Sequence, residues 1–167
     1  PQIAVGLLLD ESGSMSSGDR AAYARASAII LYDFCQALHV PVVVYGHTTG
    51  KDSVELYSYS EFDAIDREDQ YRLVDISARG SNRDGAALLF VANKLLNRPE
   101  KHKMLFLISD GLPNATCYSG SYAMADIRKI KEKLVKKGIV FQAAAIGWDK
   151  KAIQEIYGNA YLDISDL

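Results

Sequence analysis

The sequence IAVGLLL at residues 3–9 runs directly into the loop DESGS, which begins at Asp10. A short, nearly continuous apolar run is typical of a strand that is buried on both faces of a parallel sheet. The loop after it carries the side-chain oxygens of Asp10, Ser12 and Ser14. Gly13 lets the loop bend back, because glycine tolerates backbone angles that other residues resist. Magnesium and other hard cations prefer oxygen ligands, so this stretch predicts a buried strand that ends in part of a divalent-cation site.

Further strands and helices alternate along the chain. The strand candidates are residues 42–45, 54–59, 104–108, 139–146 and 161–164. The pattern at 54–59 alternates, which favours a more exposed strand at a sheet edge. The helix candidates are residues 19–38, 85–96, 122–137 and 149–157. Strands that alternate with helices predict an α/β domain with a mainly parallel sheet.

In two of the helix candidates, the sequence predicts which face packs against the core. Residues 19–38 carry apolar side chains at spacings of three and four, which predicts one face of an amphipathic helix: Tyr23, Ala26, Ile30, Phe34 and Leu38. Ser16 and Asp19 offer capping groups at its start. In the helix predicted at residues 122–137, the outer face is rich in lysine, and the side chains expected to face the core are Ile127, Ile130 and Leu134. Gly138 is expected to end this helix.

Composition and charge limit the function classes. The chain has 167 residues, of which 49% are hydrophobic and 24% charged, as in an ordinary globular domain. A net charge of −2 suggests neither a nucleic-acid nor an anionic-membrane partner. Cys35 and Cys117 make no disulfide framework, which favours a reducing, cytoplasmic setting. Because the chain begins with Pro1 and is predicted to be in a strand by Ile3, we expect residues 1–167 to be one domain of a longer protein.

Two further loops carry candidate ligands. Asp110 follows the strand at 104–108 and precedes Gly111, and the loop at residues 80–85, GSNRDG, supplies Asn82 and Asp84 just before a helix. Taken singly, an Asp-Gly pair is ordinary turn chemistry, and Asn or Asp before a helix is an ordinary cap. In an open α/β sheet, however, the ligand crevice lies beyond the carboxyl ends of the strands. If the two strands are neighbours, Asp10 and Asp110 point into the same crevice.

The three loops together resemble the von Willebrand factor A domain, in which they carry a metal-ion-dependent adhesion site. The resemblance covers nearly the whole chain, although Asn82 stands where the family more often has threonine. It implies a doubly wound, Rossmann-like sheet of about six strands with one antiparallel edge strand and helices on both faces. It also implies a bound Mg²⁺, with Mn²⁺ or Ca²⁺ as alternatives.

The same resemblance assigns roles to the loop residues. Ser12 and Ser14 are expected to contact the cation directly through their hydroxyls, and Asp10 and Asp110 mainly through water. The amide oxygen of Asn82 can serve in place of the threonine hydroxyl. A cation with neutral direct ligands keeps most of its charge, so it attracts an Asp or Glu side chain of a protein partner.

Asp84 has two possible roles. It can bond a coordinated water, which leaves the cation open to a partner, or it can bind the metal itself and weaken capture of a carboxylate. We favour the first. Five residues on the same loops are candidates to surround a docked partner: Met15, Arg79, Arg83, Leu112 and Tyr118.

Two motifs narrow the resemblance to a bacterial subgroup. NRDGAAL at residues 82–88 and LISDGLP at residues 107–113 are similar to the C-terminal domains of a cobalt chelatase subunit and of the nitric oxide reductase activation protein. These domains work with AAA+ ATPases in metal insertion or enzyme maturation. The resemblance therefore implies an AAA+ partner.

Two other classes remain as alternatives. A magnesium-dependent phosphatase or phosphotransferase also begins with an acidic residue at a strand end, but the haloacid-dehalogenase type needs a second carboxylate where this chain has Ser12. A dinucleotide-binding domain lacks its glycine-rich turn here, since Leu9 is followed by DESGSM. The sequence contains no nucleophile-elbow motif. We therefore assign no catalytic residues and expect an interaction module rather than an enzyme.

Overall fold

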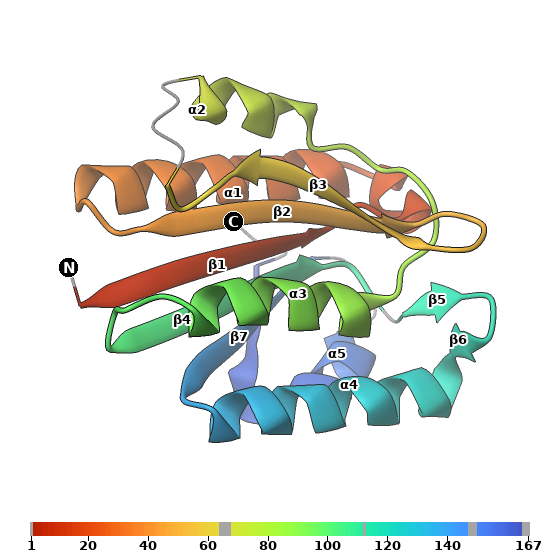
Figure 1. Cartoon of the computed structure of the whole chain (residues 1–167). Helices are drawn as coiled ribbons and strands as arrows, with labels where there is room; N and C mark the ends of the chain where they lie inside the picture. The colour runs from red at the N-terminus through yellow and green to blue at the C-terminus, as the bar shows by residue number, and fades with distance from the viewer. Residues whose placement is uncertain (1, 64–67, 112, 147–149, 165–167) are drawn as a thin grey trace.

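The computed structural model describes residues 2–63, 68–111, 113–146 and 150–164. A six-stranded sheet in the order β3-β2-β1-β4-β7-β8 forms its centre (Figure 1). The strands are β1 (Ile3–Asp10), β2 (Val42–Thr49), β3 (Val54–Ser60), β4 (His102–Ser109), β7 (Ile139–Ala145) and β8 (Tyr161–Asp163). Only the pair of β2 and β3 is antiparallel among the strand pairs of this sheet. The predicted doubly wound sheet, with its antiparallel edge strand, is confirmed.

Helices cover both faces of the sheet (Figure 1). One face packs against α1 (Arg20–Ala37) and the short turns α2 (Asp69–Arg72) and η2 (Leu73–Asp75). The other packs against α3 (Asp84–Leu96), α4 (Gly120–Lys136) and α5 (Lys150–Tyr157). The first residue of the predicted helix 149–157 lies outside the described residues. None of the helices in the described part of the chain combines the length and apolar character needed to cross a membrane.

The predicted apolar face of α1 is wrong. The side chains that pack on the sheet are Ala24, Ala28, Tyr32 and Cys35, whereas all five of the predicted residues are exposed. Ile30 and Phe34, for example, are 70% and 61% exposed. Both stripes have helical spacing, so periodicity alone does not choose between them. The small side chains of Ala24 and Ala28 let the helix approach the sheet closely, and this packing decides the orientation.

The remaining helix predictions are largely confirmed. Ile127, Ile130 and Leu134 of α4 are buried, and Gly138 follows the helix with a φ of 86°. Asp19 occupies the N-cap position of α1, but its side chain makes no capping bond. The hydroxyl of Ser16 donates instead to the carbonyl of Gly13, so it stabilises the loop before the helix.

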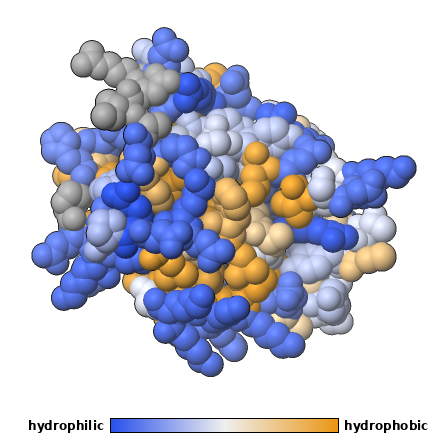
Figure 2. Space-filling model, viewed as in Figure 1, coloured by the Kyte–Doolittle hydropathy of each residue, from blue (hydrophilic) through white to orange (hydrophobic). Residues whose placement is uncertain are grey.

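Apolar side chains also gather over the centre of the face that α3 covers, surrounded by polar ones (Figure 2). Phe90 on α3 is 38% exposed and packs edge-on against Tyr45, with ring centroids 5.2 Å apart. The ammonium group of Lys94 lies about 5.5 Å from the Phe90 ring. Part of this surface is therefore used in contacts within the domain.

The strand order brings the candidate ligands together. β1 pairs in parallel with β2 on one side and β4 on the other. The chain thus leaves β1 in one direction along the sheet and later returns to the opposite side, which makes a topological switch point. Asp10 ends β1, and Asp110 directly follows β4. The expectation that β1 and β4 are neighbours, so that Asp10 and Asp110 lie at the same carboxyl-terminal end of the sheet, is confirmed.

Candidate functional site

Asp10 is the buried centre of the site. Its side chain is 1% exposed, and one carboxylate oxygen accepts the backbone N–H of Ser12 at 2.7 Å. The other oxygen accepts the amide nitrogen of Asn82 at 2.9 Å and the hydroxyl of Ser109 at 2.8 Å. The three donors come from three separate segments, and together they hold the carboxylate in one orientation.

Two serines and a second aspartate lie beside it. The hydroxyl oxygens of Ser12 and Ser14 are 3.0 Å apart, and Ser14 donates to Asp110 at 2.9 Å. The other carboxylate oxygen of Asp110 pairs with Arg20 at 2.8 Å. Burial and, next, the charge of Asp10 raise the pKa of Asp110, while Arg20 and Ser14 oppose this rise. The sequence offered no signal for Arg20, which lies 90 positions from Asp110.

The spacing of these oxygens fits a small hard cation. Mg²⁺ demands octahedral geometry with bonds of 2.0–2.1 Å, so neighbouring ligand oxygens stand about 3.0 Å apart. The Ser12 and Ser14 hydroxyl oxygens, the two expected direct ligands, have this separation. A cavity of about 140 Å³ opens here, lined by Ser12, Gly13, Ser14, Gly80, Asn82 and Asn114. In the described residues no three His, Cys, Asp or Glu side chains form a metal-binding group, so a cation here depends on hydroxyl and water ligands as well as carboxylates.

Asn82 connects the loops. Its amide nitrogen donates to Asp10, and its amide oxygen accepts the backbone N–H of Asn114 at 2.7 Å. An isolated β-bridge also joins Asn82 to Asn114. The amide oxygen therefore has one of its two lone pairs in use. Direct ligation by Asn82 stays a prediction, and the structure adds a bridging role that the sequence did not suggest.

Asp84 contacts a buried histidine. It is the first residue of α3, is 1% exposed, and has a carboxylate oxygen 3.1 Å from the Nε2 atom of His47 on β2. His47 is fully buried. Burial by itself lowers the pKa of its imidazole, but the bond to and charge of Asp84, with the charges of Asp10 and Glu11, raise it overall. His47 had shown no ligand spacing in the sequence, and its part in the site emerges only from strand register.

Glu11 is a further residue, after Arg20 and His47, whose role the sequence did not indicate. It is 0% exposed and accepts hydrogen bonds from the Tyr59 hydroxyl, from Arg79 Nε at 2.9 Å and from the Ser77 backbone at 3.3 Å. Its own carbonyl accepts the Arg79 N–H at 2.6 Å. A Cβ at Gly46 would lie 2.6 Å from the Glu11 carboxyl carbon, so glycine in β2 makes room for this buried charge.

The loops are also joined through their backbones. Gly13 N–H donates to the carbonyl of Gly80 at 2.5 Å, and residues Thr49 and Ser81 exchange two hydrogen bonds of 2.6 and 3.1 Å. A Cβ at Gly80 would lie 2.8 Å from the Thr49 carbonyl oxygen. Glycine at this position therefore permits the close approach that brings the 80–85 loop against the end of β2.

The five residues expected to surround a docked partner differ in their burial and contacts. Met15 is 1% exposed and belongs to the core, and Arg79 is bound to Glu11. The Arg83 guanidinium lies 5.8 Å from the ring centre of Tyr118, next to the site. Leu112 lies outside the described residues.

A doubly wound sheet that collects hydroxyl, amide and carboxylate oxygens beyond the ends of its parallel strands defines an α/β domain with a ligand site at its switch point. The sequence profile of the von Willebrand factor type A domain matches residues 5–160. The chain belongs to this family.

Similar proteins are much longer than this chain. "Uncharacterized protein PA0525" of Pseudomonas aeruginosa is 29% identical over 117 residues, which cover 68% of this chain and 19% of that protein. Protein NorD of Brucella abortus is 29% identical over 84 residues, covering 50% of this chain and 13% of NorD. The chain thus spans less than a fifth of the length of either relative.

Solved structures share the fold. Proximal thread matrix protein 1 from the mussel byssus, in a structure described as having a zinc-occupied MIDAS motif, superposes with a TM-score of 0.70 at 18% identity. The superposition covers 97% of this chain and 43% of that one. At this identity the likeness shows the fold alone.

The buried position of Glu11 generates a prediction about stability. In Glu11→Gln, we expect the free energy of unfolding to fall by about 1.5–3 kcal/mol, because a fully buried carboxylate loses charge-assisted bonds to Arg79 and Tyr59. Urea denaturation of Glu11→Gln and of Glu132→Gln, an exposed residue of α4, measures the difference. Equal stability of the two variants would contradict the structural role of Glu11.

Proposed function

We propose that this domain binds a divalent cation through Asp10, Ser12, Ser14 and Asp110 and thereby binds an acidic side chain of a protein partner. The distribution of charge in the site is the main support. Asp110 pairs with Arg20 and Glu11 with Arg79, and an Asp84 carboxylate oxygen lies 3.1 Å from the His47 imidazole. Among the described residues, no cationic side chain forms an ion pair with Asp10, whose three hydrogen-bond donors are all neutral. The centre of the site therefore keeps a negative charge that a cation can balance.

The ligands of the chain have distinct tasks in this proposal. Ser12 and Ser14 coordinate the cation through their hydroxyl oxygens, and the Ser14 hydroxyl also donates a hydrogen bond to Asp110. Asp10 and Asp110 act mainly through water, and Asn82 orients Asp10 and adds its amide oxygen as a ligand. A cation held in this way supplies an electrophilic position for a carboxylate from outside. Mg²⁺ is the expected ion, with Mn²⁺ or Ca²⁺ as alternatives.

Asp84 belongs among the supporting groups rather than the direct ligands. Its contact with His47 directs one carboxylate oxygen into the interior, and it is not among the residues that line the small cavity. We therefore propose that Asp84 contacts the cation through a coordinated water molecule. A crystal structure with Mg²⁺ in which an Asp84 oxygen lies at about 2.1 Å from the ion would contradict this assignment.

An interaction module fits these residues better than an enzyme. In the phosphatase alternative, a carboxylate two residues after Asp10 acts as acid and base, and here that position is Ser12, whose hydroxyl lies beside that of Ser14. The MIDAS motif of the mussel protein, which has the same fold, supports the binding role.

The similarity to NorD supports placing the domain in a bacterial subgroup related to nitric oxide reductase activation and cobalt chelatase proteins. In this proposal, residues 1–167 form one domain of a longer cytoplasmic protein. Its partner is an AAA+ ATPase that presents an Asp or Glu to the metal. Neither nucleic acid nor a membrane is part of the proposed function.

Replacing both serines tests the metal site. We expect the wild type to bind Mg²⁺ and Mn²⁺ in calorimetry, and Ser12→Ala/Ser14→Ala to lose this binding because two direct ligands are gone. Ser17→Ala is the matched control, since Ser17 is exposed on the same loop. Absence of binding by the wild type at millimolar concentrations would refute the proposal.

Arg20 is expected to weaken metal binding while it holds Asp110. In Arg20→Gln, the removal of a positive charge beside the site should tighten Mg²⁺ binding by about three- to tenfold at low salt, and less at high salt. Arg25→Gln removes the same charge from α1, but the hydrogen bonds of Arg25 to described residues go to the carbonyls of Val74 and Ile76, away from the site. Calorimetry on both variants measures the effect, and an unchanged or weaker affinity in Arg20→Gln would rule it out.

A further inference from the structure

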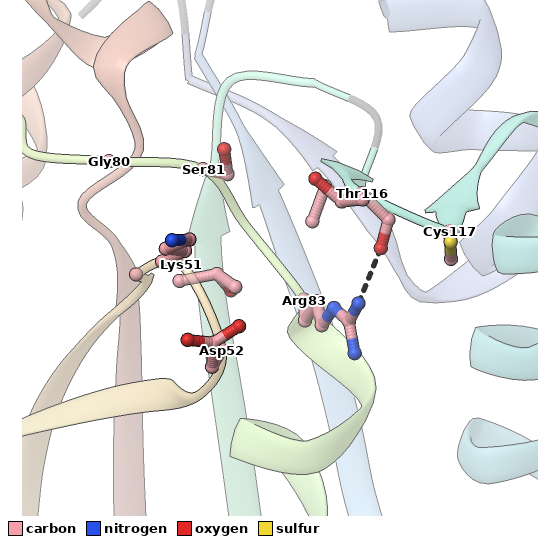
Figure 3. Close-up of a pocket in the computed structure, with 10 residues that line it drawn as sticks. Lys51, Asp52, Gly80, Ser81, Arg83, Thr116 and Cys117 are labelled. Atoms are coloured by element: carbon pink, nitrogen blue, oxygen red, sulfur yellow. Dashed lines mark hydrogen bonds between the residues drawn. The ribbon is translucent and has the colours of Figure 1, made fainter.

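A second and larger cavity lies beside the candidate metal site. Its volume is about 640 Å³, and it opens between the turn after β2, the 80–83 segment and the 115–117 segment. Figure 3 shows Lys51 and Asp52 on one side of this cavity and Arg83, Thr116 and Cys117 on the other. We call it the Arg83 cavity.

The Arg83 cavity adjoins the candidate metal site. It shares Gly80 with the small cavity that Ser12, Ser14 and Asn82 line. A third cavity, of about 410 Å³ and containing Arg20 and Asp110, shares its lining residues Ser14 and Asn114 with the small cavity. The small cavity at the candidate metal site therefore adjoins the other two, and we refer to the three together as the trough.

Arg83 carries a charge that no described carboxylate pairs with. Its guanidinium donates to the carbonyl of Thr116 and lies over the Tyr118 ring, while its Nε atom is buried without a partner. A guanidinium has five N–H donors, so further donors remain. The contrast with Arg20 and Arg79 is clear, because each of these pairs with a buried carboxylate of the site.

The cavity has a positive balance of charge. Lys51 is exposed and, like Arg83, forms no ion pair with a described residue, whereas Asp52 contributes the one carboxylate of the lining. Arg83 is half-buried, and a partly desolvated cation interacts more strongly with an incoming carboxylate than one in bulk water. Arginine also matches a carboxylate with two parallel N–H bonds.

We propose that the trough binds an extended acidic segment of a protein partner, with one carboxylate at the metal and a second at Arg83 and Lys51. The metal end rests on the proposed function, and the Arg83 end rests on the cavity and its charges. An extended chain rises about 3.3 Å per residue and places every second side chain on the same face. The spacing of the two acidic residues is therefore the feature by which this trough selects its partner.

Synthetic peptides test the second contact. The probes are capped Gly/Ser nonapeptides with one central Glu, and a series with a second Glu two, three or four residues to either side. With Mg²⁺ present, we expect one spacing to bind about three- to tenfold more tightly than the single-Glu peptide, by the usual strength of partly exposed ion pairs. Titration followed by amide NMR shifts measures both affinity and location.

The chain provides its own reporter of occupancy. Cys117 is exposed in the cavity, and Cys35 is buried in α1. Burial raises the pKa of the Cys35 thiol, which further slows its reaction. A bound two-Glu peptide should slow modification of Cys117 by N-ethylmaleimide, measured by mass spectrometry. The single-Glu peptide should leave the rate nearly unchanged.

Matched variants separate the specific contact from net charge. Arg83→Gln/Lys51→Gln should still bind Mg²⁺ and the single-Glu peptide but lose the gain from the second Glu, which is measured within each variant as the ratio of two-Glu to single-Glu affinity. Lys129→Gln/Lys133→Gln removes the same charge from the exposed face of α4 and should keep the gain. If the double variant does not fold, Lys51→Gln alone replaces it as the test. Its side chain is exposed, and the substitution should reduce the gain in affinity from the second Glu.

The outcomes distinguish this inference from the proposed function. No gain at any spacing, or a gain that survives Arg83→Gln/Lys51→Gln, overturns the inference even if the single-Glu peptide binds with Mg²⁺. Protection of Cys117 in EDTA, without any Mg²⁺-dependent shift at Ser12 or Ser14, supports the contact at Arg83 and Lys51 but overturns the metal proposal and with it the metal end of the inference. If no peptide binds under either condition, both are overturned.

Discussion

Two adjacent carboxylates at the end of β1 are buried, and the arrangement of the surrounding loops depends on them. An unpaired charge in the interior is very costly, so each carboxylate must find donors. Asp10 obtains its donors from Ser12, Asn82 and Ser109, and Glu11 obtains its own mainly from Tyr59 and Arg79. Because all of these donors except Ser12 come from distant parts of the chain, their bonds bring the loops together at the carboxyl ends of the strands.

The two carboxylates have different partners and therefore different consequences. Glu11 is paired with Arg79 and is enclosed, which makes it a structural charge. Asp10 accepts only neutral donors and lies beside the two serine hydroxyls. This contrast between neighbouring residues is what suggests a cation site at Asp10 and a fixed scaffold at Glu11. Arg83 extends the argument, since it is a nearby cation that forms no ion pair with any described carboxylate.

Much of the fold was predictable from local patterns. Buried parallel strands are continuous apolar runs, and the runs at 3–9, 104–108 and 139–146 all became central strands. The orientation of α1 was not predictable, because two stripes of residues have equivalent spacing. Contact between the sheet and the small side chains of Ala24 and Ala28 selected the less hydrophobic stripe and left Ile30 and Phe34 outside.

The sequence by itself determined the alternation of strands and helices. It placed Asp10, Ser12, Ser14 and Asp110 on loops at strand ends and Asn82 on the loop before a helix. Only the tertiary structure decided what those residues contact. Asn82 bonds to Asp10 across 72 positions, and Arg20 reaches Asp110 across 90. His47 meets Asp84 only because β2 lies beneath the start of α3. Local patterns record periodicity and turn chemistry, whereas long-range pairs depend on strand order and register, which no short stretch of sequence contains.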